Sequence, residues 1–151
     1  MWQRIQTLFL VIAILALLTS LVIPIWSAEV NGEARVLTAF YYLNNGAYQY
    51  NPYSLTAILT IAATTIALTE VTKFKNRVTQ VKLGALNSLF LVGVLVSAFY
   101  FSNQLMKGLE GVRGQYGLGM WLPFGAVVCN LLANRFIRRD EKLVRDSDRL
   151  R

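Results

Sequence analysis

Histidine is absent from the 151-residue chain, and cysteine occurs once, as Cys129. Without histidine, the chain cannot form a histidine-ligated haem, a histidine-containing zinc site or an imidazole-based catalytic triad. A single cysteine cannot form a disulfide within the chain, and a buried thiol packs as a small apolar side chain. The sequence also lacks a glycine-rich phosphate loop and a nucleophile elbow. We therefore expect no catalytic residue, no metal site and no cofactor.

Charged residues are missing from four long runs, at 5–28, 36–69, 83–106 and 114–134. About 20 mainly apolar residues cross the hydrocarbon core of a bilayer. The predicted fold class is therefore an all-α membrane protein, a four-transmembrane-helix bundle that occupies 1–151 as one integral membrane domain. The predicted spans are 5–26, 53–74, 80–102 and 117–136, with an outer loop over 27–52 and a cytoplasmic tail over 137–151.

The first run also has features of a signal peptide. A signal peptide has a shorter apolar core and small residues before its cleavage site. A cut after Ala28 would place the bulky Trp26 three residues from the cut, at a position that favours small side chains. We therefore favour a retained helix.

Lysine and arginine predict the orientation, because cytoplasmic loops of membrane proteins are enriched in them. Twelve of the 15 basic residues lie on one predicted side, at the N-terminus, between the second and third spans and in the tail. We expect a multi-pass protein of the bacterial inner membrane with both termini in the cytoplasm. The net charge of +7 then reflects topology. The basic residues lack an interleaved set of aromatic side chains that could read bases, and acidic residues dilute them in the tail, so we expect no nucleic-acid partner.

The outer segment 36–53 is rich in aromatic residues and contains Asn45-Gly46 between alternating side chains. This dipeptide is a strong hairpin signal, because a tight primed turn needs positive φ. We predict a short outer aromatic hairpin that pairs 37–44 with 47–50. An irregular aromatic belt at the membrane interface is the alternative.

Polar residues within the charge-free parts of the predicted spans are small or neutral. Thr56, Thr60 and Thr64 share one helix face, and small residues allow close helix packing in lipid. Thr65, Asn87 and Asn130 each lie five residues from a charged residue and form a candidate intramembrane polar layer. An Asn87–Asn130 hydrogen bond would join two helices at about 0.6 to 2 kcal/mol. The other interpretation is a small-molecule or ion site.

The last 17 residues contain eleven charges, with apolar residues at helical spacing. The stretch from Ala126 onward has no glycine or proline, so we predict a cytoplasmic C-terminal helical extension. Its apolar line could lie on lipid, pack on the loop between the second and third spans, bind a partner or a second copy, or remain solvated. The candidate interaction residues are Arg138, Arg139, Asp140, Leu143, Val144, Arg145 and Arg149.

The opening Gln3-Arg4-Ile5-Gln6-Thr7 and the closing segment from Arg138 to Arg151, with four apolar runs between them, resemble a known family. It comprises small inner-membrane proteins of the Bacteroidetes, catalogued as a domain of unknown function. Trp2 and Asp146-Ser147 depart slightly from its pattern. The resemblance covers the whole chain and implies a four-helix inner-membrane protein without an assigned activity.

The function expected from these observations is that of a non-enzymatic accessory or scaffold subunit with a cytoplasmic docking tail. Its expected partners are membrane lipids and either a membrane or cytoplasmic protein or a second copy of the chain. The alternative is a small carrier or channel for a neutral or lipophilic solute. A lipid-modifying enzyme is a third and weaker hypothesis, for which Glu70 and Asp140 are the carboxylates to test.

Overall fold

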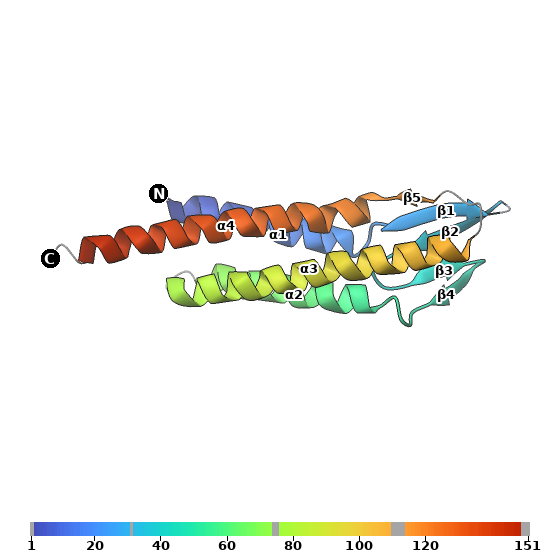
Figure 1. Cartoon of the computed structure of the whole chain (residues 1–151), viewed down its shortest axis with the longest axis horizontal. Coiled ribbons are helices and arrows are strands. Elements are labelled where there is room, and N and C mark those ends of the chain that lie inside the picture. Colours follow the sequence, from blue (N-terminus) through green and yellow to red (C-terminus); the bar gives the residue numbers. More distant parts are fainter. Residues whose placement is uncertain (1, 31, 74–75, 110–113, 149–151) are drawn as a thin grey trace.

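Four helices lie side by side, and a small antiparallel sheet lies beyond one end of them (Figure 1). This computed structural model describes residues 2–30, 32–73, 76–109 and 114–148. Both termini lie at the end opposite the sheet. We call these two ends of the bundle the sheet end and the terminal end.

The helices are α1 (Trp2–Ser20), α2 (Leu55–Thr72), α3 (Arg77–Gly108) and α4 (Leu118–Asp148). By length and composition, α2, α3 and α4 are each apolar enough to cross a membrane, whereas the apolar part of α1 covers only Ile5–Ser20. Helix α1 therefore ends six residues before the predicted limit of the first span. The chain turns at 21–23, and the backbone N–H of Ile25 then donates to the carbonyl oxygen of Leu37, which draws the chain into the sheet.

Five strands form the sheet in the order β4-β3-β2-β1-β5, and all neighbours are antiparallel. The predicted hairpin is present but shorter, as β3 (Tyr42–Asn44) and β4 (Ala47–Gln49). Its turn residues have positive φ, 50° at Asn45 and 78° at Gly46, as a primed turn requires. The prediction missed β1 (Trp26–Val30), β2 (Glu33–Leu37) and β5 (Gln115–Tyr116). The all-α prediction is thus corrected to a helical fold with a small sheet, and the predicted outer loop contains four strands.

The core has two parts. Inside the bundle, small and aliphatic side chains pack together: Ala13, Leu17, Ala63, Leu91 and Ala126. Where the helices meet the sheet, the core becomes larger and aromatic: Ile25, Trp26, Leu37, Tyr42 and Phe101. Small residues let the helix backbones approach closely without a hydrophobic force between them.

The outward faces of the helices are also apolar. Leu89 on α3 is 68% exposed and Val96 is 62% exposed, with comparable side chains on α1, α2 and α4. An apolar surface this extensive is unusual for a soluble monomer and is typical of a bilayer-facing bundle. Burial inside and apolarity outside agree with helices that are long enough to cross a membrane.

Glycines at the start of α4 permit close contact with the chain that follows α1. The backbone N–H groups of Gly117 and Gly119 donate to the carbonyl oxygens of Ile25 and Pro24, at 2.9 and 3.0 Å. A Cβ at Gly119 would lie 2.4 Å from the carbonyl oxygen of Ile23. The lack of a side chain at these glycines thus allows the start of α4 to join the sheet end.

Candidate functional site

Two asparagines form the centre of a polar cluster between α3 and α4. The Asn87 side-chain amide donates to the Asn130 Oδ1 at 3.2 Å, so the predicted hydrogen bond between the helices is present. The Asn130 amide donates in turn to the Gly84 carbonyl oxygen at 3.2 Å and to the Ser88 Oγ at 2.9 Å. Both asparagines are fully buried. The cluster therefore joins two helices in a place where water cannot compete for the hydrogen bonds.

Asn134 extends this cluster by one turn toward the terminal end. Its side chain lies against Gly84 so closely that a Cβ there would meet the Asn134 Oδ1 at 1.9 Å. The Asn134 Oδ1 is buried and has no hydrogen-bond partner among the described residues. Asn134 was not predicted as a site residue. A signal existed in the sequence, because Asn130 and Asn134 are four residues apart and so share a helix face.

Thr65 does not belong to the polar layer. It is exposed, and its hydroxyl donates to the Ile61 carbonyl oxygen of its own helix at 2.9 Å. The adjacent threonine face is the buried one, with Thr56, Thr60 and Thr64 turned inward. The Thr60 and Thr64 hydroxyls donate to carbonyl oxygens four residues earlier, at 2.7 and 2.8 Å. A shared distance from charged residues predicted depth for Thr65, but not the direction that its side chain faces.

Glu70, one of the two carboxylates considered for a lipid-modifying enzyme, is buried in α2. Its side chain is 0% exposed, and neither carboxylate oxygen has a hydrogen-bond partner in the described part of the chain. The Gln80 side-chain amide donates to the Glu70 backbone carbonyl oxygen at 2.9 Å. Helix α2, which is apolar enough to cross a membrane, therefore contains a buried ionisable side chain. Helical spacing gave the signal, because Ala63, Ala67 and Glu70 share the buried face.

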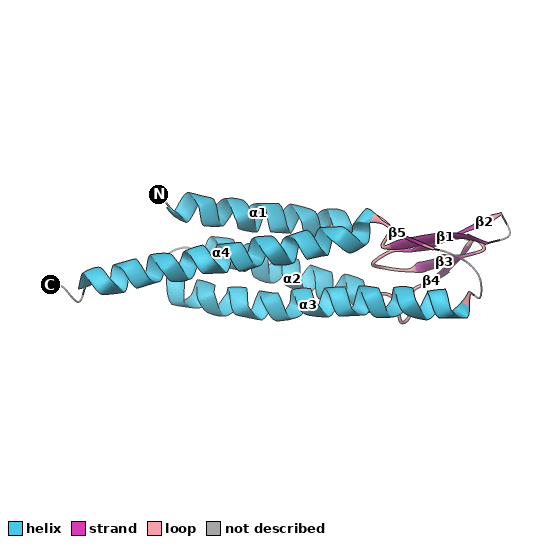
Figure 2. Cartoon of the chain, turned by 45° about the horizontal axis from the view of Figure 1, so that its top comes forward, coloured by secondary structure: helices cyan, strands magenta, loops and turns pink. Residues whose placement is uncertain are grey.

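All of the predicted interaction residues except Arg149 lie on one continuous helix. Helix α4 runs through them to Asp148 and extends beyond the other three helices (Figures 1 and 2). Asp140 forms an ion pair with Arg77 at the start of α3, at 2.7 Å, so it is engaged within the chain. Arg138, Arg139 and Leu143 are exposed. Arg149 lies outside the described residues, as do the side chains of Val144 and Arg145.

The predicted apolar line of the C-terminal helix begins at Phe136, and this residue packs on α1. The Phe136 ring stacks on the Phe9 ring with centroids 5.8 Å apart, and Ile137 is buried. Leu143, two turns further on, is 56% exposed. The line is thus divided into a part that holds the bundle together and a part that faces outward.

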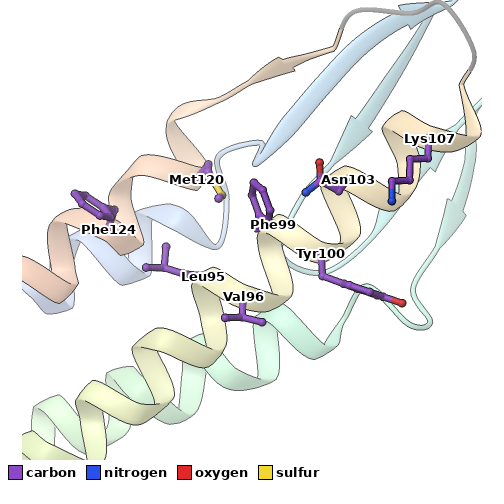
Figure 3. A pocket seen from close by; sticks show the side chains of 8 residues that line it. All are labelled: Leu95, Val96, Phe99, Tyr100, Asn103, Lys107, Met120 and Phe124. Atoms are coloured by element: carbon purple, nitrogen blue, oxygen red, sulfur yellow. The ribbon is translucent and has the colours of Figure 1, made fainter.

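A shallow apolar pocket of about 560 Å³ lies between α3 and α4 near the sheet end (Figure 3). Leu95, Phe99, Met120 and Phe124 form its walls, and Lys107 is on the last turn of α3, at its sheet-end rim. Its lining contains no carboxylate, and its polar side chains are Tyr100, Asn103 and Lys107. The apolar walls can hold a hydrocarbon chain.

Aromatic residues connect the sheet to the bundle. Tyr53 lies between Tyr42 and Phe101, with ring centroids 5.5 and 5.3 Å away. Burial raises the pKa of the Tyr53 phenol, and the neighbouring Tyr42 phenol raises it further. A phenol that remains neutral suits this partly buried position, where the sheet meets the helices.

The described residues contain no group of three or more acidic, cysteine or histidine side chains that could hold a metal ion. No curated protein matches the sequence. One family profile does match, over residues 2–150, which is nearly the whole chain. The chain therefore belongs to the family described as Domain of unknown function (DUF4293).

Proposed function

We propose that the protein is a four-span inner-membrane subunit without enzymatic activity, which binds a partner through its α4 extension. In this arrangement the terminal end faces the cytoplasm and the sheet caps the bundle on the outer side. The distribution of lysine and arginine supports the orientation. Helix α1 would be the fourth span, with its short apolar part completed by the turn at 21–23.

The extension of α4 is the observation that carries the proposal. A helix that continues past its bundle exposes side chains that no neighbouring helix covers, and Leu143 is such a side chain. The Arg77–Asp140 ion pair fixes the base of the extension against α3. A rigid, partly apolar helix at the membrane surface suits a groove on a partner protein.

Photo-crosslinking from the extension tests this proposal. A photoreactive amino acid at Leu143 should give a discrete crosslinked product after mild detergent extraction, while the same probe at exposed Lys142 should give little. Coexpression of two differently tagged copies would distinguish a second copy from another protein. A monomer without crosslinks, or equal products from both positions, would contradict the proposal.

The alternative function, a small carrier or channel, needs a water-accessible passage among α2, α3 and α4. The threonine face that would line it is buried, and the Thr60 and Thr64 hydroxyls are satisfied by their own helix. The Asn87–Asn130 pair likewise uses its polar groups to join helices. These contacts favour the accessory role.

A further inference from the structure

A second pocket between α3 and α4, of about 250 Å³, lies toward the terminal end of the bundle. Its lining residues are Ala85, Ser88, Leu131, Asn134, Arg135 and Arg138. Two are cations and none is an acid. Among the described side chains, neither Arg135 nor Arg138 forms an ion pair. The pocket thus carries positive charge that the described part of the chain does not neutralise.

The geometry of the polar wall suits an anion. Arg135 and Arg138 are three residues apart and therefore lie on the same side of α4. Asn134 is 6% exposed, and its unpartnered Oδ1 is an acceptor that cannot bind an anion, so the two guanidinium groups would provide the donors to a negatively charged ligand. The Ser88 hydroxyl is already occupied, because it donates to the Gly84 carbonyl oxygen and accepts from Asn130. Guanidinium groups bind phosphate oxygens in bidentate geometry.

The wall nearer the middle of the bundle is apolar and open. Leu131 is 55% exposed, and the same face continues through Leu89 and Val92 on α3 and Val128 on α4. From Ala85 to Leu95, where the sheet-end pocket begins, ten residues of helix rise roughly 15 Å. That rise is about half of the hydrocarbon thickness of a bilayer. Arg135 is the first cation after the charge-free run 114–134, so it lies at the expected headgroup level.

We propose that this pocket binds the phosphate of an anionic phospholipid from the inner leaflet, with one acyl chain along Leu131 and Leu89. Arg135 and Arg138 hold the phosphate, and the exposed apolar face holds the chain. The proposal goes beyond a docking role and rests on the proposed orientation only for the choice of leaflet. A free phosphate ion has the same headgroup chemistry but leaves the apolar face unused.

Native mass spectrometry of the detergent-purified, delipidated full chain tests the site. Phosphatidylglycerol should bind more tightly than phosphatidylcholine with the same acyl chains. Arg135→Gln with Arg138→Gln should weaken phosphatidylglycerol binding about tenfold or more, because each cation near an anionic lipid contributes severalfold. The matched control, Lys73→Gln with Lys142→Gln, removes the same charge at exposed positions outside the pocket and should change binding less than about twofold.

A second pair of variants tests the acyl-chain contact without changing charge. Leu131→Trp should obstruct the apolar wall and weaken lipid binding, whereas Leu68→Trp, at a similarly exposed position on α2, should not. Equal affinity for the two lipids, equal loss in the two charge variants, or complete displacement of lipid by inorganic phosphate at the same concentration would overturn the proposal. These binding experiments in detergent do not depend on orientation, so their failure is distinguishable from failure of the proposed topology.

Discussion

At the scale of single residues, the Asn87–Asn130 pair allows a direct measurement of interhelical coupling. Asn130→Leu should destabilise the bundle, because Asn87 and the Gly84 carbonyl oxygen lose buried hydrogen bonds. Replacing both asparagines by leucine should cost less than the sum of the single losses, with a coupling of about 0.6 to 2 kcal/mol. Reversible unfolding in mixed micelles measures this cycle. Strict additivity would mean that the pair contributes no coupling.

Gly84 and Asn134 form a second testable contact. Gly84→Ala should destabilise by about 1–3 kcal/mol, because the new methyl group overlaps the Asn134 side chain. Asn134→Ala should restore most of the loss when the two changes are combined. Gly93→Ala on the same helix is the control: its methyl group meets only Leu59, at 3.6 Å, and should be neutral or gain up to about 1 kcal/mol.

The sequence predicted part of the polar site and not the rest, for a physical reason. The number of residues between a polar side chain and the nearest charge estimates its depth within a predicted span. Asn87 and Asn130 have the same estimated depth, and they do form a hydrogen bond. Direction around the helix axis needs the positions of neighbouring helices. Thr65 and Thr64 are adjacent in sequence, yet one is exposed and the other buried. Glu70 is buried even though a carboxylate is costly in an apolar interior, and its buried position likewise depends on how the neighbouring helices pack.

At the scale of elements, the junction between α4 and the chain after α1 depends on glycine. Gly119→Ala should destabilise by about 1–3 kcal/mol, because the methyl group would meet backbone carbonyl oxygens, which cannot rotate away. Gly125→Ala, six residues further along α4, is the control, since no atom lies within 4 Å of its new methyl group. Equal stabilities of the two variants in a thermal unfolding assay would refute this role for Gly119.

Some strands of the sheet carry a signal in the sequence, and one does not. Asn45-Gly46 predicted one hairpin, and the sequence repeats the dipeptide at 31–32, a signal that could have found β1 and β2. Strand β5 has only two residues and pairs with Trp26 and Ser27, far away in the sequence. Two residues show no periodicity, so this strand could be found only from the tertiary fold.

At the scale of the whole molecule, the proposed topology makes a prediction about access. In a Cys129→Ala background, a cysteine at Tyr48 on β4 should react with a membrane-impermeant maleimide on intact bacterial cells. A cysteine at Lys142 should react only after the membrane is opened, because the two positions lie at opposite ends of the bundle. Labelling of the cysteine that replaces Lys142 in intact cells would contradict the proposed orientation.

The strand order has a consequence for synthesis on the ribosome. Strand β1 is an interior strand of the finished sheet, yet its neighbour β5 begins only at Gln115, after three helices have been made. Until then, the backbone groups of β1 on that side have no strand beside them, and an unpaired edge is prone to pair with the wrong chain. A polypeptide truncated just before Gln115 should therefore aggregate through this unpaired edge of β1. The sheet is complete only when β5 and the helix that follows it have been made.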